Sequence, residues 1–361
     1  MTITDDEPNR TLIIEPSPDG HRFYYVNLLI AGALRRGDDV TLLTSAASLD
    51  RPEFRLYIKK WIGEIKVATA EKFAVQDVAR HARNFSADLT VVPDGDAFTF
   101  RLARTRRWRG PGAVSTLIMR ESVPSSGLIG MRFAKKQLKA LLIRRANRMR
   151  NVRATVLKSA LWRASSSDVP AVADPVSVQT DRLAIEAVRS QLMLDPGTYW
   201  FGVIGVISAR KNPVIVLDAL AACPPISLGV VIAGQIDQQI LDEVLDAAAR
   251  ARSAGHRVVV ENRLLDSDEL DSLVAAVDCV VLAHSNEGPS GILGKATVTG
   301  TRIITAGAVS LASDARSHPD MMSWHVLDVA SLTDAFTLTS RKQRPEKVGA
   351  SSAADFAMAL L

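Results

Sequence analysis

Short apolar runs of strand length alternate with segments of helical spacing along most of the chain, in two successive series. The first series has strand-like runs at residues 11–15, 40–44, 88–92, 113–119 and 154–157, with helical segments near 26–36, 71–85, 98–107 and 127–149. The second has strand-like runs at 199–207, 227–233, 257–261, 279–283 and 302–305, with helical segments at 212–222, 236–253, 267–277 and 291–299. Because a strand–helix–strand connection joins parallel strands, this alternation predicts an α/β fold with two Rossmann-like doubly wound sheets.

A segment rich in serine, proline and alanine separates the two series at residues 164–180 (ASSSDVPAVADPVSVQT) and has no periodicity. It predicts a first domain at residues 1–165, a linker at 166–180 and a second domain at 181–345. The apolar tail at 351–361 predicts a short helix, so residues 346–361 are assigned to a C-terminal helical segment. A chain of 361 residues is long enough for two domains of ordinary size.

Several classes of protein are excluded by composition. The first ten residues are polar and acidic, unlike a signal peptide, and no apolar run approaches the ~18 residues of a membrane span. Cys223 and Cys279 lie in apolar stretches and predict buried thiols in a reducing compartment. The six histidines lack metal-ligand spacing, and the loop at 16–21 lacks the glycine pattern of a dinucleotide site. We therefore expect a cytoplasmic protein with no metal and no cofactor.

The net charge of +5 hides a strong asymmetry along the chain. Residues 101–163 carry 17 Lys or Arg and one acid, Glu121, which leaves −11 on the remainder. Such a basic block predicts an anionic partner, which could be a membrane surface, a phosphorylated acceptor or nucleic acid. Nucleic acid is the weakest of the three, because Trp108 and Trp162 are not part of a recognisable nucleic-acid module.

The longest helical segment of the first series, at residues 127–149, lies inside this basic block. Its apolar positions recur at three- and four-residue steps, at Met131, Ala134, Leu138, Leu141, Leu142 and Met149, with Lys and Arg between them. An apolar stripe with a basic flank is typical of helices that lie on anionic membranes. The alternative is that the stripe packs on the first sheet while the cations face water, and both can hold together.

Loops that follow the strands are where ligands of open parallel sheets bind. After the run at 199–207 come Arg210 and Lys211, then Asn212, which can cap the next helix, and Pro213, which suits its first position. Two cations beside a helix N-terminus predict a diphosphate site, because the helix dipole and free N–H groups already favour anions. The alternative is a solvated surface pair.

A second loop, after the run at 279–283, reads HSNEGPSGILGKA. Ser290 and Gly291 open a helix there and can present several backbone N–H groups to a phosphate. Glu287, a carboxylate just before this cradle, is a candidate for binding sugar hydroxyls; the alternative is an ordinary loop carboxylate.

These motifs together resemble the C-terminal domain of retaining GT-B glycosyltransferases of the family-4 type. The resemblance covers residues 199–306 well and the first domain only through Gly20-His21. It rests on the order and spacing of Gly202–Gly205, Arg210-Lys211-Asn212, Ile232-Ala233-Gly234, Leu264 to Leu270, Val277-Asp278 and Glu287 to Ala296. It implies the GT-B fold, in which two Rossmann-like domains face each other across a cleft.

The resemblance also assigns roles to individual residues. Arg210 and Lys211 would hold the donor diphosphate, and Glu287 would act at the donor sugar as a catalytic residue. The second glutamate of the family motif, which accepts hydrogen bonds from the ribose, is replaced here by Lys295, which has only donors. The remaining candidates for donor binding are Gly234, Arg263, Leu264, Ser290, Gly291, Ile292 and Leu293.

The expected function is retaining transfer of a hexosyl group from a nucleotide-sugar to a hydroxyl acceptor. Gly20 and His21 would lie on the acceptor side, with His21 catalytic; the alternative is a loop histidine that caps a helix. The basic block suggests a lipid-linked glycan acceptor in cell-envelope or exopolysaccharide synthesis, with the protein peripheral on the cytosolic face of the membrane. Lys295 keeps open another class, a catalytically impaired partner or binding subunit of a glycan assembly complex.

Overall fold

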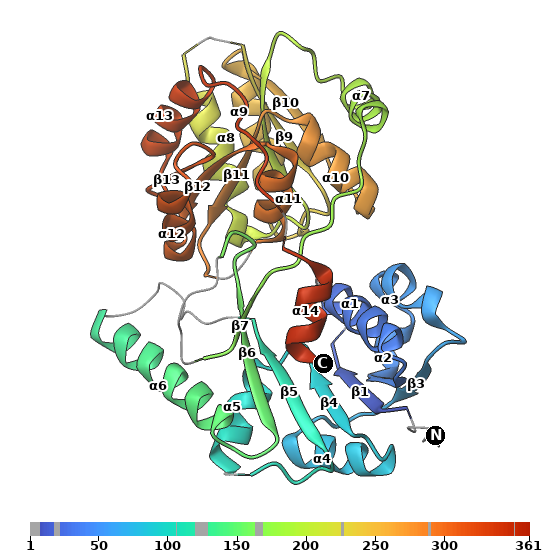
Figure 1. Cartoon of the computed structure of the whole chain (residues 1–361). Coiled ribbons are helices and arrows are strands. Elements are labelled where there is room, and N and C mark those ends of the chain that lie inside the picture. The colour runs from blue at the N-terminus through green and yellow to red at the C-terminus, as the bar shows by residue number, and fades with distance from the viewer. Residues whose placement is uncertain are drawn as a thin grey trace.

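Two parallel β-sheets, each covered by helices on both faces, make up the protein (Figure 1). The structure is a computed structural model of the whole chain. It describes residues 8–17, 22–105, 107–119, 129–162, 169–224, 227–287, 290–349 and 351–361, without the side chains of residues 129–136.

The first sheet has seven parallel strands in the order β3-β2-β1-β4-β5-β6-β7. Its strands are β1 (Arg10–Glu15), β2 (Asp39–Thr44), β3 (Lys66–Thr69), β4 (Leu89–Val92), β5 (Ala113–Ile118), β6 (Val152–Lys158) and β7 (Ala171–Ala173). The helices of this domain are α1 (Arg22–Arg35), α2 (Ala46–Leu49), α3 (Pro52–Tyr57), the 3₁₀ turn η1 (Lys59–Trp61), α4 (Val75–Asn84), α5 (Asp96–Thr105) and α6 (Ile129–Asn147).

The second sheet has six parallel strands in the order β10-β9-β8-β11-β12-β13. Its strands are β8 (Tyr199–Ile204), β9 (Leu228–Ala233), β10 (Arg257–Glu261), β11 (Cys279–His284), β12 (Arg302–Gly307) and β13 (Met322–His325). Its helices are α7 (Arg182–Gln191), the 3₁₀ turn η2 (Ala209–Lys211), α8 (Pro213–Ala221), α9 (Leu241–Ser253), α10 (Ser267–Ala276), α11 (Gly291–Thr299), α12 (Val309–Ser317) and α13 (Val329–Thr339).

Both sheets follow the same winding, as the sequence predicts. In each sheet, the second and third strands of the series lie on one side of its first strand, and the fourth strand lies on the other side. The winding therefore reverses between β1 and β4 in the first sheet, and between β8 and β11 in the second. Ligands of such sheets bind at this reversal, beyond the carboxyl ends of the strands.

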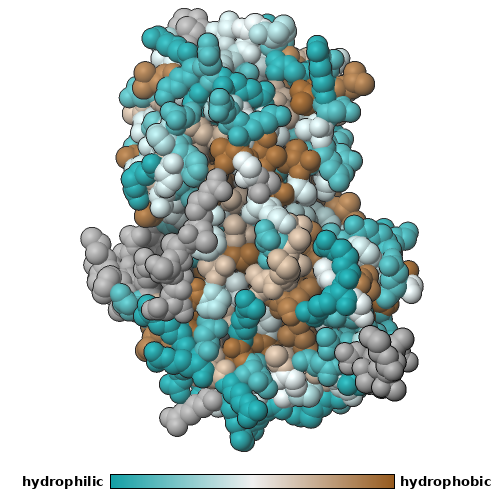
Figure 2. Space-filling model, in the orientation of Figure 1, coloured by the Kyte–Doolittle hydropathy of each residue, from teal (hydrophilic) through white to brown (hydrophobic). Residues whose placement is uncertain are grey.

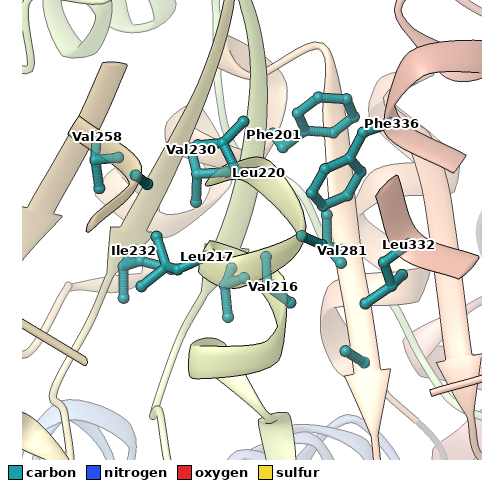
Figure 3. Packing of buried hydrophobic residues seen from close by; sticks show 14 of the residues in the cluster. Phe201, Val216, Leu217, Leu220, Val230, Ile232, Val258, Val281, Leu332 and Phe336 are labelled. Carbon is teal, nitrogen blue, oxygen red and sulfur yellow. The ribbon is translucent and has the colours of Figure 1, made fainter. Parts of the chain in front are cut away.

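Side chains of β8 show how both faces of a sheet are buried. Because side chains alternate along a strand, Phe201 and Val203 join the cluster under α8, α9 and α13, whereas Trp200 and Ile204 join the one under α10, α11 and α12. Phe201 stacks on Phe336 of α13 with ring centroids 4.3 Å apart (Figure 3). Burying such a ring contributes about 1.5–3 kcal/mol.

On the face shown in Figure 2, hydrophilic residues lie mainly toward the periphery of both domains, and more hydrophobic residues lie nearer the centre. Within the described parts of the chain, no helix is long and apolar enough to cross a membrane. Cys223 and Cys279 are both buried free thiols, as expected.

The boundary between the domains differs from the prediction. Residues 171–173, placed in the linker from the sequence, form β7, which pairs with β6 at the edge of the first sheet. The C-terminal helix is present as α14 (Ala353–Leu360), and it packs on the first domain. There Phe356 stacks on Tyr25 of α1 with ring centroids 5.2 Å apart.

The predicted helix at 127–149 corresponds to α6, but its buried face is rotated from the predicted stripe. Ile143 and Ala146 are buried against the first sheet, with Leu142 and Met149 packed beside them. Leu138 and Leu141, which the alternative of packing on the first sheet would bury, are 52% and 58% exposed. The sequence offered apolar residues on more than one side of this helix, and packing selected among them.

Candidate functional site

Beside the winding reversal of the second sheet, the ends of β8 and β9 bring two glycine backbones into close contact. Gly205 follows β8 and Gly234 follows β9, with φ angles of +87° and +130°. A Cβ atom on Gly234 would lie 2.3 Å from the carbonyl oxygen of Gly205, so a larger residue cannot occupy this position. Gly234, a sequence-predicted site residue, therefore shapes the floor of the site through its backbone.

The turn η2 is fixed to the end of β11 by hydrogen bonds. Asn212 has left-handed backbone angles, φ 48° and ψ 49°, and its side-chain Nδ2 donates to the carbonyl oxygens of Ala283 (2.7 Å) and Arg210 (3.1 Å). The backbone N–H of Ser285 donates to Arg210 as well, at 2.9 Å. Asn212 occupies the N-cap position of α8, as predicted, but its side chain makes no cap hydrogen bond and holds this loop instead. Pro213 does occupy the first turn of α8.

Lys211 is buried at this reversal, whereas its neighbour Arg210 is exposed. The Nζ of Lys211 donates to the carbonyl oxygen of Ile204 at 2.7 Å. Burial, assisted by the positive charge of Arg210, lowers the pKa of Lys211 to about 7. A bound anion would offset both effects, so the pair is suited to holding negative charge.

The first turn of α11 lies beside Lys211. A Cβ atom on Gly205 would be 3.4 Å from Lys211 Nζ and 3.7 Å from Ile292 Cδ1, so the two side chains flank the same point. Ile292 and Leu293 are buried in the core, which leaves only their backbone N–H groups for a ligand. Ser290 occupies the N-cap position without a side-chain cap bond, and a Cβ on Gly291 would meet no atom within 4 Å. The start of α11 and the side chain of Lys211 therefore lie on the same side of the site, an arrangement whose chemistry suits an anion.

His284, the last residue of β11, was not singled out by the sequence. Its side chain is 6% exposed, and its Nε2 has no hydrogen-bond partner among the described residues. Burial, with the positive charges of Lys211 and Arg210, lowers the pKa of His284 to about 3, so the imidazole is neutral at pH 7. Its place at the end of a predicted strand was the available signal.

Glu287 makes contacts that the sequence did not predict. One carboxylate oxygen accepts from the backbone N–H of Val309 and the other from that of Ser310, each at 2.9 Å. These N–H groups belong to the first turn of α12, so the carboxylate stabilises the positive end of that helix. In this structure Glu287 holds α12 beside the site.

Lys295 bridges α11 to two other segments. Its Nζ donates to a carboxylate oxygen of Asp271 on α10 and, at 3.1 Å, to the carbonyl oxygen of Ser177 in the linker. The other oxygen of Asp271 accepts from the backbone N–H of Gln179 at 2.8 Å. Lys295 is therefore occupied in joining α11, α10 and the linker.

Arg263 is also bound by protein groups. It donates to Glu261 at 2.7 Å and to both oxygens of Glu269 at 2.8 and 2.9 Å, and these bonds raise its pKa. Its side chain fixes the loop after β10, next to a cavity of about 20 Å³ that Leu265 also lines. Leu264 is 51% exposed in the same loop.

The sequence matches no model of a known protein family, and no curated protein matches it. The structure, however, is similar to several solved structures over almost its whole length. Anabaena HepE in complex with UDP and glucose is 16% identical, with 97% of this chain and 94% of that chain covered and a TM-score of 0.65. A glycosyltransferase from Rickettsia africae is 9% identical, with 98% and 92% covered and a TM-score of 0.64. Sucrose-phosphate synthase from Thermosynechococcus elongatus is 12% identical, with 98% and 94% covered and a TM-score of 0.63.

The chain has the GT-B fold. The two wound sheets and the coverage of both domains by these structures confirm the fold class predicted from the sequence. At such low identity the similarity concerns the fold alone.

The first domain of this GT-B chain has its own winding reversal, between β1 and β4. Arg22 pairs with Asp94 at 2.7 Å and lies 4.0 Å from an oxygen of Glu15, which ends β1. That oxygen accepts from the N–H of Ser17 at 3.0 Å, and the other has no partner among the described residues. Burial raises the pKa of Glu15 to about 8, although the Ser17 bond and Arg22 lower it. The predicted residues Gly20 and His21 lie outside the described residues.

A metal site is not evident in the parts of the chain that the structure describes, where no three His, Cys, Asp or Glu residues gather.

Proposed function

We propose that this protein is a glycosyltransferase that moves a sugar from a nucleoside-diphosphate donor to a hydroxyl acceptor. The observation that carries the proposal is the pairing of Arg210 and Lys211 with the N-terminus of α11 at the winding reversal of the second sheet. The solved structures of Anabaena HepE contain UDP or UDP-glucose in the same fold. The second domain would bind the donor, and the first would bind the acceptor.

The residues of the site support departure of the diphosphate. Negative charge grows on the leaving group as the sugar–phosphate bond breaks. Arg210, Lys211 and the N–H groups at the start of α11 are held in place by the protein, so they can stabilise that charge without reorganising. No metal is part of this proposal, because fixed cations and a helix end would neutralise the phosphates.

Retention at the anomeric carbon is the stereochemistry that we propose, from the resemblance of the second domain to retaining enzymes. In that case Glu287 would act at the donor sugar through the acceptor capacity that remains on its oxygens, while it also holds α12. His21 would act on the acceptor side.

The proposal is tested in two steps. Thermal shift with UDP, GDP and ADP and their sugar conjugates should identify a stabilising nucleotide, because binding to the native state raises the unfolding temperature. The stabilising conjugate should then be hydrolysed slowly, with water as the acceptor. Early proton NMR spectra should show the released sugar with the anomeric configuration of the donor. Inverted product would contradict retention, and no stabilisation by any nucleotide would contradict the function.

Lys295 favours a second candidate, a catalytically impaired partner or binding subunit of a glycan assembly complex. Its ammonium is engaged by Asp271 and Ser177, and it offers no acceptor to a ribose hydroxyl. This candidate predicts nucleotide binding without hydrolysis or transfer. Lys295→Glu, which would place a carboxylate beside Asp271, serves to test whether a ribose acceptor alone restores turnover.

We further propose that α6 attaches the protein reversibly to an anionic membrane surface, which suits a lipid-linked acceptor in cell-envelope or exopolysaccharide synthesis. The exposed side of α6 carries Leu138 and Leu141 together with Arg144 and Arg145, and Arg148, directly after the helix, is exposed as well. Each cation near an anionic surface contributes about 1 kcal/mol, and exposed leucines can enter the headgroup boundary.

Vesicle co-sedimentation tests this attachment. The wild-type protein should bind anionic vesicles at low salt and leave them at about 0.5 M salt, because screening shortens the range of charge attraction. Leu138→Ser with Leu141→Ser should weaken binding. Leu245→Ser on α9, another partly exposed leucine, should not. Equal binding to neutral and anionic vesicles, or none to either, would contradict the proposal.

A further inference from the structure

His284 has a buried ring nitrogen that lacks a partner next to two cations. Buried polar atoms in folded proteins are almost always hydrogen-bonded, and an unmade bond is costly. The Nε2 of His284 has no partner among the described residues, although only 6% of the residue is exposed to solvent. The positive charges that act on the ring are those of Lys211 and Arg210. The nearby carboxylate of Glu287 is held by the N–H groups of α12.

The direction of the side chain follows from strand alternation. In β11, Cys279, Val281 and Ala283 join the cluster under α8, α9 and α13, whereas Val280 and Leu282 join the cluster that contains Ile292 of α11. His284 continues the second set, so its ring lies on the α11 side of the sheet. That is the side on which Lys211 Nζ approaches Ile292.

The loop that carries the cations is joined to this strand end directly. Asn212 bonds to Ala283, and Ser285 donates to Arg210, on either side of His284. The backbone of His284 is therefore held in the same structural unit as the backbone of Arg210 and Lys211.

We propose that His284 is a third ligand of the donor diphosphate and donates its Nε2–H to a phosphate oxygen. The proposal rests on the proposed nucleotide-sugar function and adds a neutral donor to the two cations. A neutral imidazole protonated on Nε2 can donate without taking up a proton, so it contributes at pH values where Lys211 is partly uncharged. An anion also supplies the partner that the buried nitrogen lacks.

Calorimetric titration with UDP, GDP, ADP and inorganic pyrophosphate tests this assignment. His284→Leu should weaken binding of the preferred diphosphate about 10-fold or more, which is typical for a hydrogen bond to a charged group. His284→Gln keeps an N–H donor and should retain most of the affinity. His256→Gln is the matched control, because His256 is a buried histidine that bonds Cys223 away from these cations.

A second measurement reports on the ring directly, even if a variant folds poorly. In nitrogen-15 spectra of the wild-type imidazoles, the diphosphate should shift the Nε2 resonance of His284 and leave that of His256 in place. An unchanged His284 resonance, or His284→Leu with wild-type affinity while Arg210→Ala is weakened, would overturn this inference alone. Binding of pyrophosphate but of no nucleotide would overturn the nucleotide-sugar function. In that case, the affinities of the His284 variants for pyrophosphate would still test whether His284 binds a diphosphate. Binding of none of the four probes would overturn both.

Discussion

The two domains wind their sheets in the same way but place different ionisable groups at the reversal. In the second domain, the loops after β8 and β11 bring together Arg210, Lys211 and the neutral His284. In the first domain, the ends of β1 and β4 bring together Glu15 and Asp94, with Arg22 between them. The fold therefore decides where side chains converge, and the few residues that end or follow the strands decide whether those side chains are mainly basic or mainly acidic.

The difference extends to how charge is buried. Lys211 is a buried base whose pKa falls to about 7, and Glu15 is a buried acid whose pKa rises to about 8. Burial is the main cause of both shifts. Each domain therefore has, at its reversal, a buried ionisable group whose charged form is disfavoured. An anionic ligand would favour the charged form of Lys211, and a cationic ligand would favour the charged form of Glu15.

The largest expected effect removes the charge from the second domain. Arg210→Ala together with Lys211→Ala should weaken nucleoside-diphosphate binding by about 100-fold or more, since each charge-assisted contact contributes about 1.5–3 kcal/mol. Calorimetry measures the affinity, and Arg182→Ala, in an exposed ion pair on α7, is the control. Wild-type affinity in the double variant would show that the cations at the reversal of the second sheet do not bind the diphosphate.

The next effect concerns the first domain. Glu15 has a raised pKa in the folded state, so its protonated form stabilises the fold fully below its ordinary pKa of about 4.5, and this contribution is lost as pH rises toward about 8. Glu15→Gln removes the titration and should raise the free energy of unfolding by up to about 4 kcal/mol at pH 8 relative to wild type. Denaturant titrations at pH 5 and pH 8 measure it. If the variant shows the same pH dependence of stability as wild type, the titration of Glu15 is not its cause.

A smaller effect is the pH dependence of nucleotide binding. Because Lys211 binds anions only when protonated, the affinity for the diphosphate should fall by up to about 10-fold per pH unit above its pKa of about 7. Lys211→Met should bind more weakly at pH 6 and show a flatter profile. Calorimetry between pH 6 and pH 9 decides this, and a flat wild-type profile would mean that Lys211 stays charged.

The smallest effect separates the two roles of Glu287. Glu287→Gln keeps one acceptor oxygen for the N–H groups of Val309 and Ser310, so the free energy of unfolding should fall by only about 1 kcal/mol. If Glu287 also contacts the donor sugar, donor hydrolysis should fall much more than affinity for the bare diphosphate. Equal losses of both would leave only the structural role.

Features set by local sequence were predictable, and features set by tertiary contacts were not. The strands and helices at residues 199–305 follow from apolar runs and their spacing, which is local information. β7 has three residues and exists through pairing with β6, and the buried face of α6 depends on what it packs against. Shorter elements such as α3 and β13 carry too weak a pattern to be recognised.

The same distinction holds within the site. The positions of Arg210, Lys211 and the start of α11 beyond the ends of their strands could be predicted from their order in the sequence. The partners of Glu287 lie 22 and 23 residues away, and Lys295 meets Asp271 and Ser177 only through the fold. His284 could be found only once its burial was known.

The position of α14 on the first domain has a mechanical consequence. The chain passes between the domains once after β7 and again before α14, and the two passages are hydrogen-bonded side by side: Val176 N–H donates to the carbonyl oxygen of Ser351 at 3.3 Å, and the hydroxyl of Ser351 donates to that of Asp174. A single linker would let one domain swivel freely about the other. Two hydrogen-bonded segments resist twisting more than bending. The domains should therefore open and close by hinge bending about these two segments.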